Sequence, residues 1–287
     1  MAVVTVLFVG GTGESYPEDS RDRVGGLLSR VACRLDARFD CRWVGYPASY
    51  GPVPDLSGMS YLDSVHEGVA NLRARLDATA GPVMLVGYSQ GAVVIRNMLA
   101  GLENPGTGTV VAVGFVADPH QPPGAVRGCD GFGLAGEGAP MPGDIPVIWI
   151  ADPADVICNA SGDSLLRDFA DLTAAMSIRD VRGWTRHLWE VLSRNNFQNA
   201  QRTSIHPRQW RKDARRLRVA MLEIAGYLPG KLMWRGLRIV NSRGGRHTAY
   251  DAEPLAGSAA SGCEVLAHWL QVQVTFLPFG GVDRHVA

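Results

Sequence analysis

Short runs of apolar, often β-branched residues alternate along this 287-residue chain with longer segments in which apolar residues recur every three or four positions. The short runs indicate strands buried on both faces, and the longer segments indicate amphipathic helices. This alternation predicts a parallel sheet covered by helices on both sides. The predicted strands are Val3–Val9, Cys41–Tyr46, Val83–Val86, Val110–Val116 and Val147–Ile150, and the predicted helices are Arg21–Phe39, Ser60–Thr79, Gln90–Leu102 and Ser261–Val272.

The pattern changes after Cys158, because residues 159–235 contain helix patterns and no convincing strand. We therefore expect an α/β core formed by residues 1–158 and 236–287, interrupted by a helical insertion at 159–235. The apolar faces that we expect in this insertion are Leu165, Phe169, Leu172 and Met176, then Trp184, Leu188 and Val191, then Trp210, Ala214, Leu217, Met221 and Ile224.

The last of these helices carries a strongly basic run, Arg208–Arg218. Such a run on an amphipathic helix is usually a solvated face, and we interpret it so. The tryptophans around it are expected to belong to the core rather than to a sugar-binding surface. They are Trp184, Trp189, Trp210 and Trp234.

The pentapeptide Gly87-Tyr88-Ser89-Gln90-Gly91 fits the pattern G-x-S-x-G. It follows a predicted strand and precedes a predicted helix, which is the context of the nucleophile elbow in α/β-hydrolases. The turn is so tight that side chains beside the serine would clash with the strand and the helix, which explains the two glycines. We therefore predict an α/β-hydrolase with Ser89 as its nucleophile.

A serine hydroxyl needs a histidine base, which in turn needs a carboxylate to fix its tautomer. In α/β-hydrolases the order along the chain is serine, then acid, then histidine. His247 alone occupies a loop just before a final helix, so we predict it as the base. The other histidines after the serine are His187 in a helix pattern, His206 before a proline, His268 within the last helix and His285 near the terminus.

Three aspartates follow predicted strands and compete for the role of the acid. Asp118 and Asp152 each precede a proline, which favours a turn-forming role. Asp155 lies further along the loop after Val147–Ile150, where catalytic groups gather in open α/β sheets. We predict Asp155 as the acid.

The tetrahedral intermediate of an acyl transfer needs hydrogen-bond donors for its oxyanion. The backbone N–H of Gln90, directly after the nucleophile, is one predicted donor. The second is expected from the loop Gly10–Glu14, with Thr12 as the candidate. This glycine-rich loop has neither the G-x-G-x-x-G pattern nor a P-loop lysine, which argues against a phosphate cradle.

Composition limits the remaining possibilities. The formal net charge is zero, so nothing predicts a nucleic-acid partner. No apolar run approaches the ~20 residues of a membrane span, and no signal peptide is evident at the N-terminus. The five cysteines show no metal-site spacing, and we expect free, mostly buried thiols, with a Cys33/Cys41 or Cys129/Cys158 bridge as the alternative. We expect a monomer that needs neither a metal nor a cofactor.

Three motifs carry a family resemblance: Gly87–Gly91, Tyr46-Pro47-Ala48, and Asp155-Val156-Ile157-Cys158. With them the chain resembles the cutinase-like serine esterases, and within these the lysin B enzymes of mycobacteriophages, which carry an extra helical domain between the acid and the histidine. The resemblance implies hydrolysis of the ester between mycolic acids and arabinogalactan. It also implies synthesis in the host cytoplasm and action at the mycobacterial cell envelope during lysis.

Other functions remain open from the sequence. A general cutinase-like lipase or carboxylesterase would use the same residues on other long-chain esters. A mycolyl or acyl transferase would pass the acyl group to an alcohol instead of water, and a binding protein of this fold would have no turnover. Because the insertion begins after Asp155 and ends before His247, we expect it to form one wall of the substrate cleft.

Overall fold

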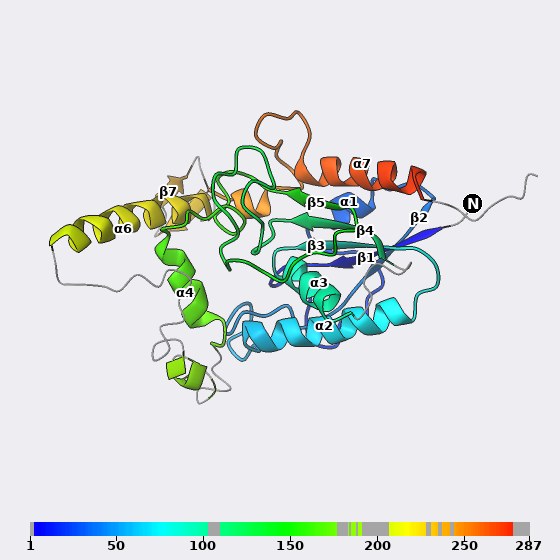
Figure 1. The fold of residues 1–287 in the computed structure, drawn as a ribbon, viewed down its shortest axis with the longest axis horizontal. Coiled ribbons are helices and arrows are strands. Elements are labelled where there is room, and N and C mark those ends of the chain that lie inside the picture. Colours follow the sequence, from blue (N-terminus) through cyan, green and yellow to red (C-terminus); the bar gives the residue numbers. More distant parts are fainter. Residues whose placement is uncertain are drawn as a thin grey trace, which may run out of the picture.

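The computed structural model describes residues 3–102, 110–176, 183, 185–187, 189–190, 207–227, 231–234, 237–241 and 244–277. Its centre is a parallel sheet with the strand order β2-β1-β3-β4-β5 (Figure 1). The architecture confirms the predicted α/β-hydrolase fold class. The strands are β1 (Val4–Val9), β2 (Phe39–Trp43), β3 (Val83–Tyr88), β4 (Val110–Val116) and β5 (Val147–Ile150).

Helices cover both faces of the sheet, with α1 and α7 on one side and α2 and α3 on the other (Figure 1). The alternation along β1 explains why both faces are apolar. Val6 and Phe8 belong to the core under α1 and α7, whereas Leu7 and Val9 belong to the core under α2 and α3. The helix bounds are α1 (Ser29–Ala32), α2 (Tyr61–Asp77), α3 (Gln90–Ala100) and α7 (Gly262–Thr275).

The predicted helix over Arg21–Phe39 is wrong. Only α1 is helical there, although Leu27 and Leu28 are buried as the apolar pattern indicates. Gly26 has a φ of +57°, and a Cβ at this position would lie 2.3 Å from Oε1 of Glu14. The backbone therefore turns in a left-handed conformation just before α1, which a continuous helix does not allow.

The insertion contains α4 (Leu165–Thr173) and α6 (Pro207–Tyr227), where the first and third helices of the insertion were predicted. Phe169, Met221 and Ile224 of the predicted apolar faces are nevertheless exposed, and the core position expected of Trp189 is wrong, because this side chain is 72% exposed. The second face, at Trp184, Leu188 and Val191, lies outside the described residues. The expectation of no strand is wrong, because β6 (Lys231–Trp234) pairs antiparallel with β7 (Leu237–Val240) across the predicted domain boundary. No helix in the described ranges is long and apolar enough to cross a membrane.

All β-strands of the main sheet are parallel, so their carboxyl ends lie at one edge. Ser89 directly follows β3, and the loop Gly10–Glu14 follows β1. Asp155 follows β5, and His247 lies in the single turn of 3₁₀ helix η1 (Arg246–Thr248). This edge is where ligands bind in open α/β sheets, so the topology brings the predicted site residues together.

Candidate active site

Ser89 occupies a strained turn between β3 and α3, with a φ of 51° and a ψ of −117°. The steric explanation predicted for the glycines on either side of the serine is confirmed. A Cβ on Gly91 would lie 2.1 Å from the carbonyl oxygen of Val9, and a Cβ on Gly87 would lie 2.8 Å from the backbone of Ala92. The turn therefore lets strand and helix approach closely and leaves the serine side chain at the sheet edge.

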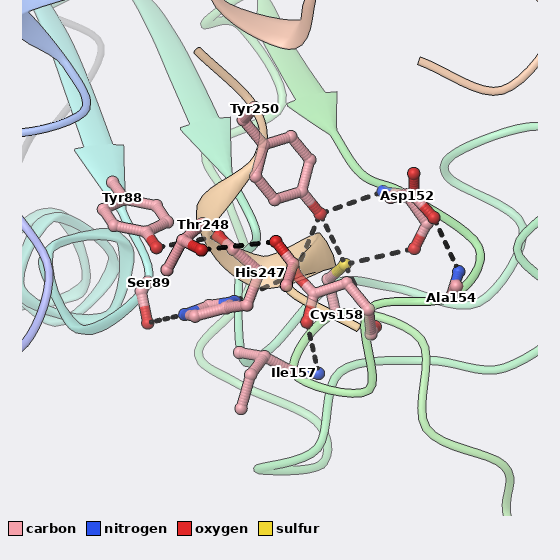
Figure 2. Close-up of polar contacts among 11 residues, drawn as sticks. Tyr88, Ser89, Asp152, Ala154, Ile157, Cys158, His247, Thr248 and Tyr250 are labelled. Carbon is pink, nitrogen blue, oxygen red and sulfur yellow. Dashed lines mark hydrogen bonds and ion pairs between the residues drawn. The ribbon is translucent and has the colours of Figure 1, made fainter. Parts of the chain in front are cut away.

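Ser89, His247 and Asp155 form one continuous series of hydrogen bonds. Oγ of Ser89 lies 3.0 Å from Nε2 of His247, and Nδ1 of His247 lies 2.9 Å from Oδ2 of Asp155. Figure 2 shows the serine hydroxyl and the imidazole directed toward each other. Residues that are far apart in the sequence thus meet with the geometry of a nucleophile, a base and an orienting acid.

Asp155 has no exposed side-chain surface. Burial alone would raise the pKa of this carboxyl group, but the pKa is lowered below its usual value by His247 and by the N–H of Ile157 and the hydroxyl of Tyr250. Asp155 is therefore an ionised acceptor, and Nδ1 of His247 donates the proton of their hydrogen bond. Nε2 is then left unprotonated toward Ser89, as a general base requires.

Tyr250 is a member of the site that the sequence reasoning missed. Its hydroxyl donates to Oδ2 of Asp155 at 2.8 Å and accepts from the backbone N–H of Asp152 at 2.9 Å. Sγ of Cys158 lies 3.5 Å from the same hydroxyl (Figure 2). The only signal in the sequence is that Tyr250 follows His247 by three residues, within the same loop.

Two further aromatic residues hold the imidazole. The hydroxyl of Tyr88 donates to the backbone carbonyl of His247 at 2.8 Å, and the two rings lie 5.2 Å apart. The ring of Tyr227, at the end of α6, lies 5.5 Å from the His247 ring. The insertion therefore reaches the carboxyl edge of the sheet at Tyr227, close to His247.

The two predicted oxyanion donors also lie side by side. Gln90 is the first residue of α3, where backbone N–H groups have no partner within the helix. Oγ1 of Thr12 donates to Oε1 of Gln90 at 3.4 Å, and Nε2 of Gln90 donates to the carbonyl of Ser49 at 2.9 Å. The Gln90 side chain thus joins the loop after β1 to the beginning of α3.

Glu14 braces the same loop, and the sequence analysis gave it no role. Its carboxylate accepts the N–H of Gly11 at 2.8 Å and the N–H of Leu27 at 2.6 Å. Burial raises the pKa of Glu14 above its ordinary value, although these two N–H groups act in the opposite direction. The loop that carries Thr12 is therefore fixed by a partly buried carboxyl group that accepts two backbone N–H groups.

The rejected aspartates have other partners. Asp118 is buried and pairs with Arg96, and it also accepts Nε1 of Trp149 at 3.0 Å. This ion pair goes beyond the turn-forming role expected of Asp118. Asp152 accepts the N–H of Ala154 at 2.8 Å, a local turn contact that agrees with the prediction.

The other candidate histidines are not part of this series. Nε2 of His187 lies 3.0 Å from the backbone carbonyl of Asp171, and His268 is exposed on α7. His206 and His285 lie outside the described residues. A surface depression of about 590 Å³ is lined by Arg34, Glu264, His268 and Gln271, among others, and includes none of Ser89, Asp155 and His247. The hydrogen bonds, and not this depression, therefore locate the candidate site.

The cysteines are free thiols in the structure. Cys33 is exposed and Cys41 is partly buried, whereas Cys129, Cys158 and Cys263 are buried. Burial raises the pKa of Cys158 well above its ordinary value, so this thiol stays protonated beside Asp155. Cys158 therefore acts as a neutral packing group in the acid loop.

Two sequence comparisons match parts of this chain to known proteins. The family model of the PE-PPE domain matches residues 38–129. This range includes Ser89 and ends before Asp155 and His247. The SL1278 acyltransferase Chp1 of Mycobacterium tuberculosis is 36% identical over 84 residues, which make up 27% of this chain and 20% of Chp1. The match thus spans about a fifth of the length of that curated relative.

Solved structures share the fold at low sequence identity. Lysin B from Mycobacteriophage D29 is similar over 94% of this chain and 99% of that protein, with 13% identity and a TM-score of 0.49. A cutinase-like protein from Cryptococcus sp. covers 67% of this chain and 94% of its own, with 17% identity and a TM-score of 0.39. Both similarities concern the arrangement of helices and strands.

Proposed function

We propose that this chain is a serine esterase that forms an acyl-enzyme on Ser89. The observation that carries the proposal is the series of hydrogen bonds from Oγ of Ser89 through His247 to the buried Asp155. A hydroxyl, an imidazole and a carboxylate in this order are what acyl transfer at neutral pH requires. The strained elbow supports the same role, because strain is found at functional sites.

The geometry supports a two-step reaction. Oγ of Ser89 attacks the ester carbonyl while Nε2 of His247 takes its proton, and Asp155 stabilises the imidazolium that forms. The N–H of Gln90 and the loop at Thr12 stabilise the oxyanion. His247 then protonates the leaving alcohol. Water, activated by the same histidine, releases the carboxylic acid and restores Ser89.

The substrate that we propose is a long-chain acyl ester, and specifically the ester between mycolic acids and arabinogalactan. The support is the resemblance at Gly87–Gly91 and at Asp155–Cys158 to the cutinase-like esterases and the lysin B enzymes. The position of Tyr227 beside His247 also suits an acyl chain held against the insertion. Action at the mycobacterial cell envelope, during phage-induced lysis, belongs to the same proposal.

Acyl transfer is the second candidate, because the curated relative over 84 residues is named an acyltransferase. A transferase would share every step up to the acyl-enzyme. A sugar or lipid hydroxyl would then replace water as the attacking group, with His247 as its base. The two functions therefore differ in the acceptor and not in the residues of the series.

The test is to incubate the full chain with purified mycolyl-arabinogalactan, with and without an added sugar acceptor, and to analyse the lipid products. Free mycolic acid would support hydrolysis, and a mycolyl sugar would support transfer. A fluorophosphonate probe should label Ser89 in the same samples, as read by mass spectrometry. Ser89→Ala should lose labelling and turnover, while Ser20→Ala, at an exposed serine, should keep both. No labelling of Ser89 in a folded chain would contradict the proposed mechanism.

A further inference from the structure

Arg167 of the insertion donates hydrogen bonds to the loop that follows β5 and carries Asp155, which we call the acid loop. It lies in the first turn of α4, and its side chain is completely buried. Nε donates to the carbonyl of Ser161 at 2.9 Å, and Nη2 donates to the carbonyl of Ala160 at 2.7 Å. This buried side chain therefore links the insertion to the acid loop.

The same guanidinium group binds the loop that follows β4. Nη2 also donates to the carbonyl of Phe132 at 3.0 Å, and Nη1 donates to the carbonyls of Gly133 at 2.6 Å and Leu134 at 3.4 Å. The guanidinium carbon lies 3.5 Å from the centre of the Phe132 ring. Backbone carbonyl groups that lose contact with water need a donor, and arginine offers its N–H donors in a fixed plane, whereas lysine has a single ammonium group. Burial lowers the pKa of Arg167 to about 10, so the group stays charged at neutral pH.

Backbone hydrogen bonds join the two loops beside this arginine. The N–H of Phe132 donates to the carbonyl of Ala160 at 3.1 Å, and the N–H of Ala160 donates to the carbonyl of Phe132 at 2.9 Å. The N–H of Leu134 donates to the carbonyl of Ile157 at 2.9 Å. Ile157 in turn donates its own N–H to Oδ1 of Asp155 at 3.0 Å. A continuous series of contacts thus leads from the buried guanidinium group to the carboxylate.

Helix α4 is attached to the core at the end away from Arg167. Oγ1 of Thr173 lies 2.6 Å from the hydroxyl of Tyr50, and the carbonyl of Ala174 accepts the N–H of Leu62 at 3.2 Å. Figure 1 shows α4 between α6 and the beginning of α2. The arginine therefore projects from an anchored helix, so it can restrain the two loops.

We propose that Arg167 is a positioning residue for Asp155. It satisfies carbonyl groups on both loops and so fixes the N–H of Ile157, which in turn sets the direction of the carboxylate. A displacement of ~1 Å at a catalytic group can cost ~10²-fold in rate. This role rests on the proposed function, because only a reaction that uses Asp155 as the orienting acid requires the carboxylate to be held in this place.

The first experiment is a double-mutant cycle in the full-length chain. Arg167→Met removes the donors but keeps a long side chain beside Phe132, and it should lower kcat on p-nitrophenyl butyrate by ~10- to 100-fold with little change in KM. In the Asp155→Asn background the same substitution should lower kcat by less than about threefold, since a positioning residue has little effect once its target is lost. A residue that only supports the fold would lower kcat by the same factor in both backgrounds, and this result would overturn the proposal.

Arg216→Met is the matched control, because Arg216 is also a buried arginine of the insertion. Its partners among the described residues are the carbonyl of Asp163, at 3.0 Å, and the carboxylate of Asp168, at 2.9 Å, and both lie beyond the part of the acid loop that Arg167 binds. This variant should lower kcat far less than Arg167→Met does. Equal losses would mean that any damage to the insertion slows the reaction, which would refute a specific role of Arg167.

A conservative variant provides a further check. Arg167→Lys keeps the positive charge with fewer donors, so it should lose less kcat than Arg167→Met. Circular dichroism compares the folding of all variants with that of the parent chain. Arg167→Lys takes the place of Arg167→Met in the cycle if the methionine variant does not fold.

A second readout needs no turnover. The proton on Nδ1 of His247, which donates to Asp155, should give a low-field signal in the proton NMR spectrum of the Ser89→Ala chain. Arg167→Met should broaden or abolish this signal, and Arg216→Met should preserve it. An unchanged signal in Arg167→Met would overturn the positioning role. Loss of the signal in Arg167→Met, together with no ester turnover by the parent chain, would support the positioning role and contradict the proposed function.

Discussion

The hydroxyl of Tyr250 donates to the same oxygen of Asp155 that accepts Nδ1–H of His247. The two donors share one buried carboxylate oxygen, so they compete for its negative charge. The hydroxyl in turn accepts the N–H of Asp152, which fixes it to the loop after β5. Tyr250 thus sets both the position of Asp155 and the charge that His247 experiences.

Tyr250→Phe should therefore lower kcat by roughly tenfold and leave KM of a short soluble ester nearly unchanged. One hydrogen bond to a charged group is worth ~1.5–3 kcal/mol, and only part of this free energy affects His247. Without the tyrosine donor, more negative charge remains for the imidazolium. The acidic limb of the pH profile of kcat/KM should move to higher pH. Tyr16→Phe, at a 52% exposed tyrosine, is the control. An acidic limb at the same pH as in the parent chain would show that Tyr250 supports the loop by packing and does not affect the charge on Asp155.

Asp155→Asn should reduce kcat by ~10⁴, since an amide favours the wrong imidazole tautomer. Steady-state kinetics with a p-nitrophenyl ester measure the effect. Asp152→Asn is the matched control, because this side chain makes a local contact with Ala154 and none with His247. A larger loss of kcat in Asp152→Asn than in Asp155→Asn would show that Asp152 is the acid and would refute the assignment of Asp155.

The stability of the chain should depend on the ionisation of Asp155. Its pKa in the folded state is lowered, so the carboxylate stabilises the fold at pH values above the unfolded pKa of ~3.9, and this contribution is lost as the pH falls through the folded pKa. The free energy of unfolding of Asp155→Asn should thus lie below that of the parent chain at pH 7, and the difference should shrink below about pH 4. Urea unfolding at several pH values measures it. A difference that grows with acidification would have the opposite sign and contradict the pKa direction.

Tyr227→Ala should affect long acyl chains more than short ones. The ring lies beside His247 and brings the end of α6 to the candidate site. Removing it takes away apolar surface for the acyl chain, at ~0.8 kcal/mol for each CH₂ that loses its contact. kcat/KM for p-nitrophenyl esters of increasing length should show the difference, with Tyr16→Phe as the control. Equal losses on butyrate and palmitate esters would indicate that Tyr227 orients His247 and takes no part in acyl binding.

All five strands of the main sheet and the elbow could be located from the sequence, although the prediction of Cys41–Tyr46 as a strand is wrong at both ends, because β2 spans Phe39–Trp43. The strands Val110–Val116 and Val147–Ile150 were predicted with the bounds that the structure has, because both are apolar throughout. The first is a central strand that is buried along almost all of its length, and the second is the partly buried edge strand of the sheet. The elbow could also be predicted, because a Cβ at Gly87 or Gly91 would clash with nearby backbone atoms and the sequence shows glycine at both positions. His247 and Asp155 followed from chain order and loop position, and the structure places both within hydrogen-bond distance of their predicted neighbours.

Which faces of the insertion are buried, and which residues support the site, depends on contacts between segments that are distant in the sequence. Met221 and Ile224 belong to the predicted apolar face of α6, yet both are exposed, whereas Arg216 is buried and pairs with Asp168. Glu223 likewise accepts hydrogen bonds from Ser161 and Ser164, and no pattern within α6 reveals these partners. Likewise Tyr250 acts through Asp155, which is 95 residues away in the sequence, and Glu14 contacts Leu27 across 13 residues. Hydrophobic periodicity predicts which residues lie on one face of a helix, but it does not predict whether that face packs against the rest of the chain or contacts solvent.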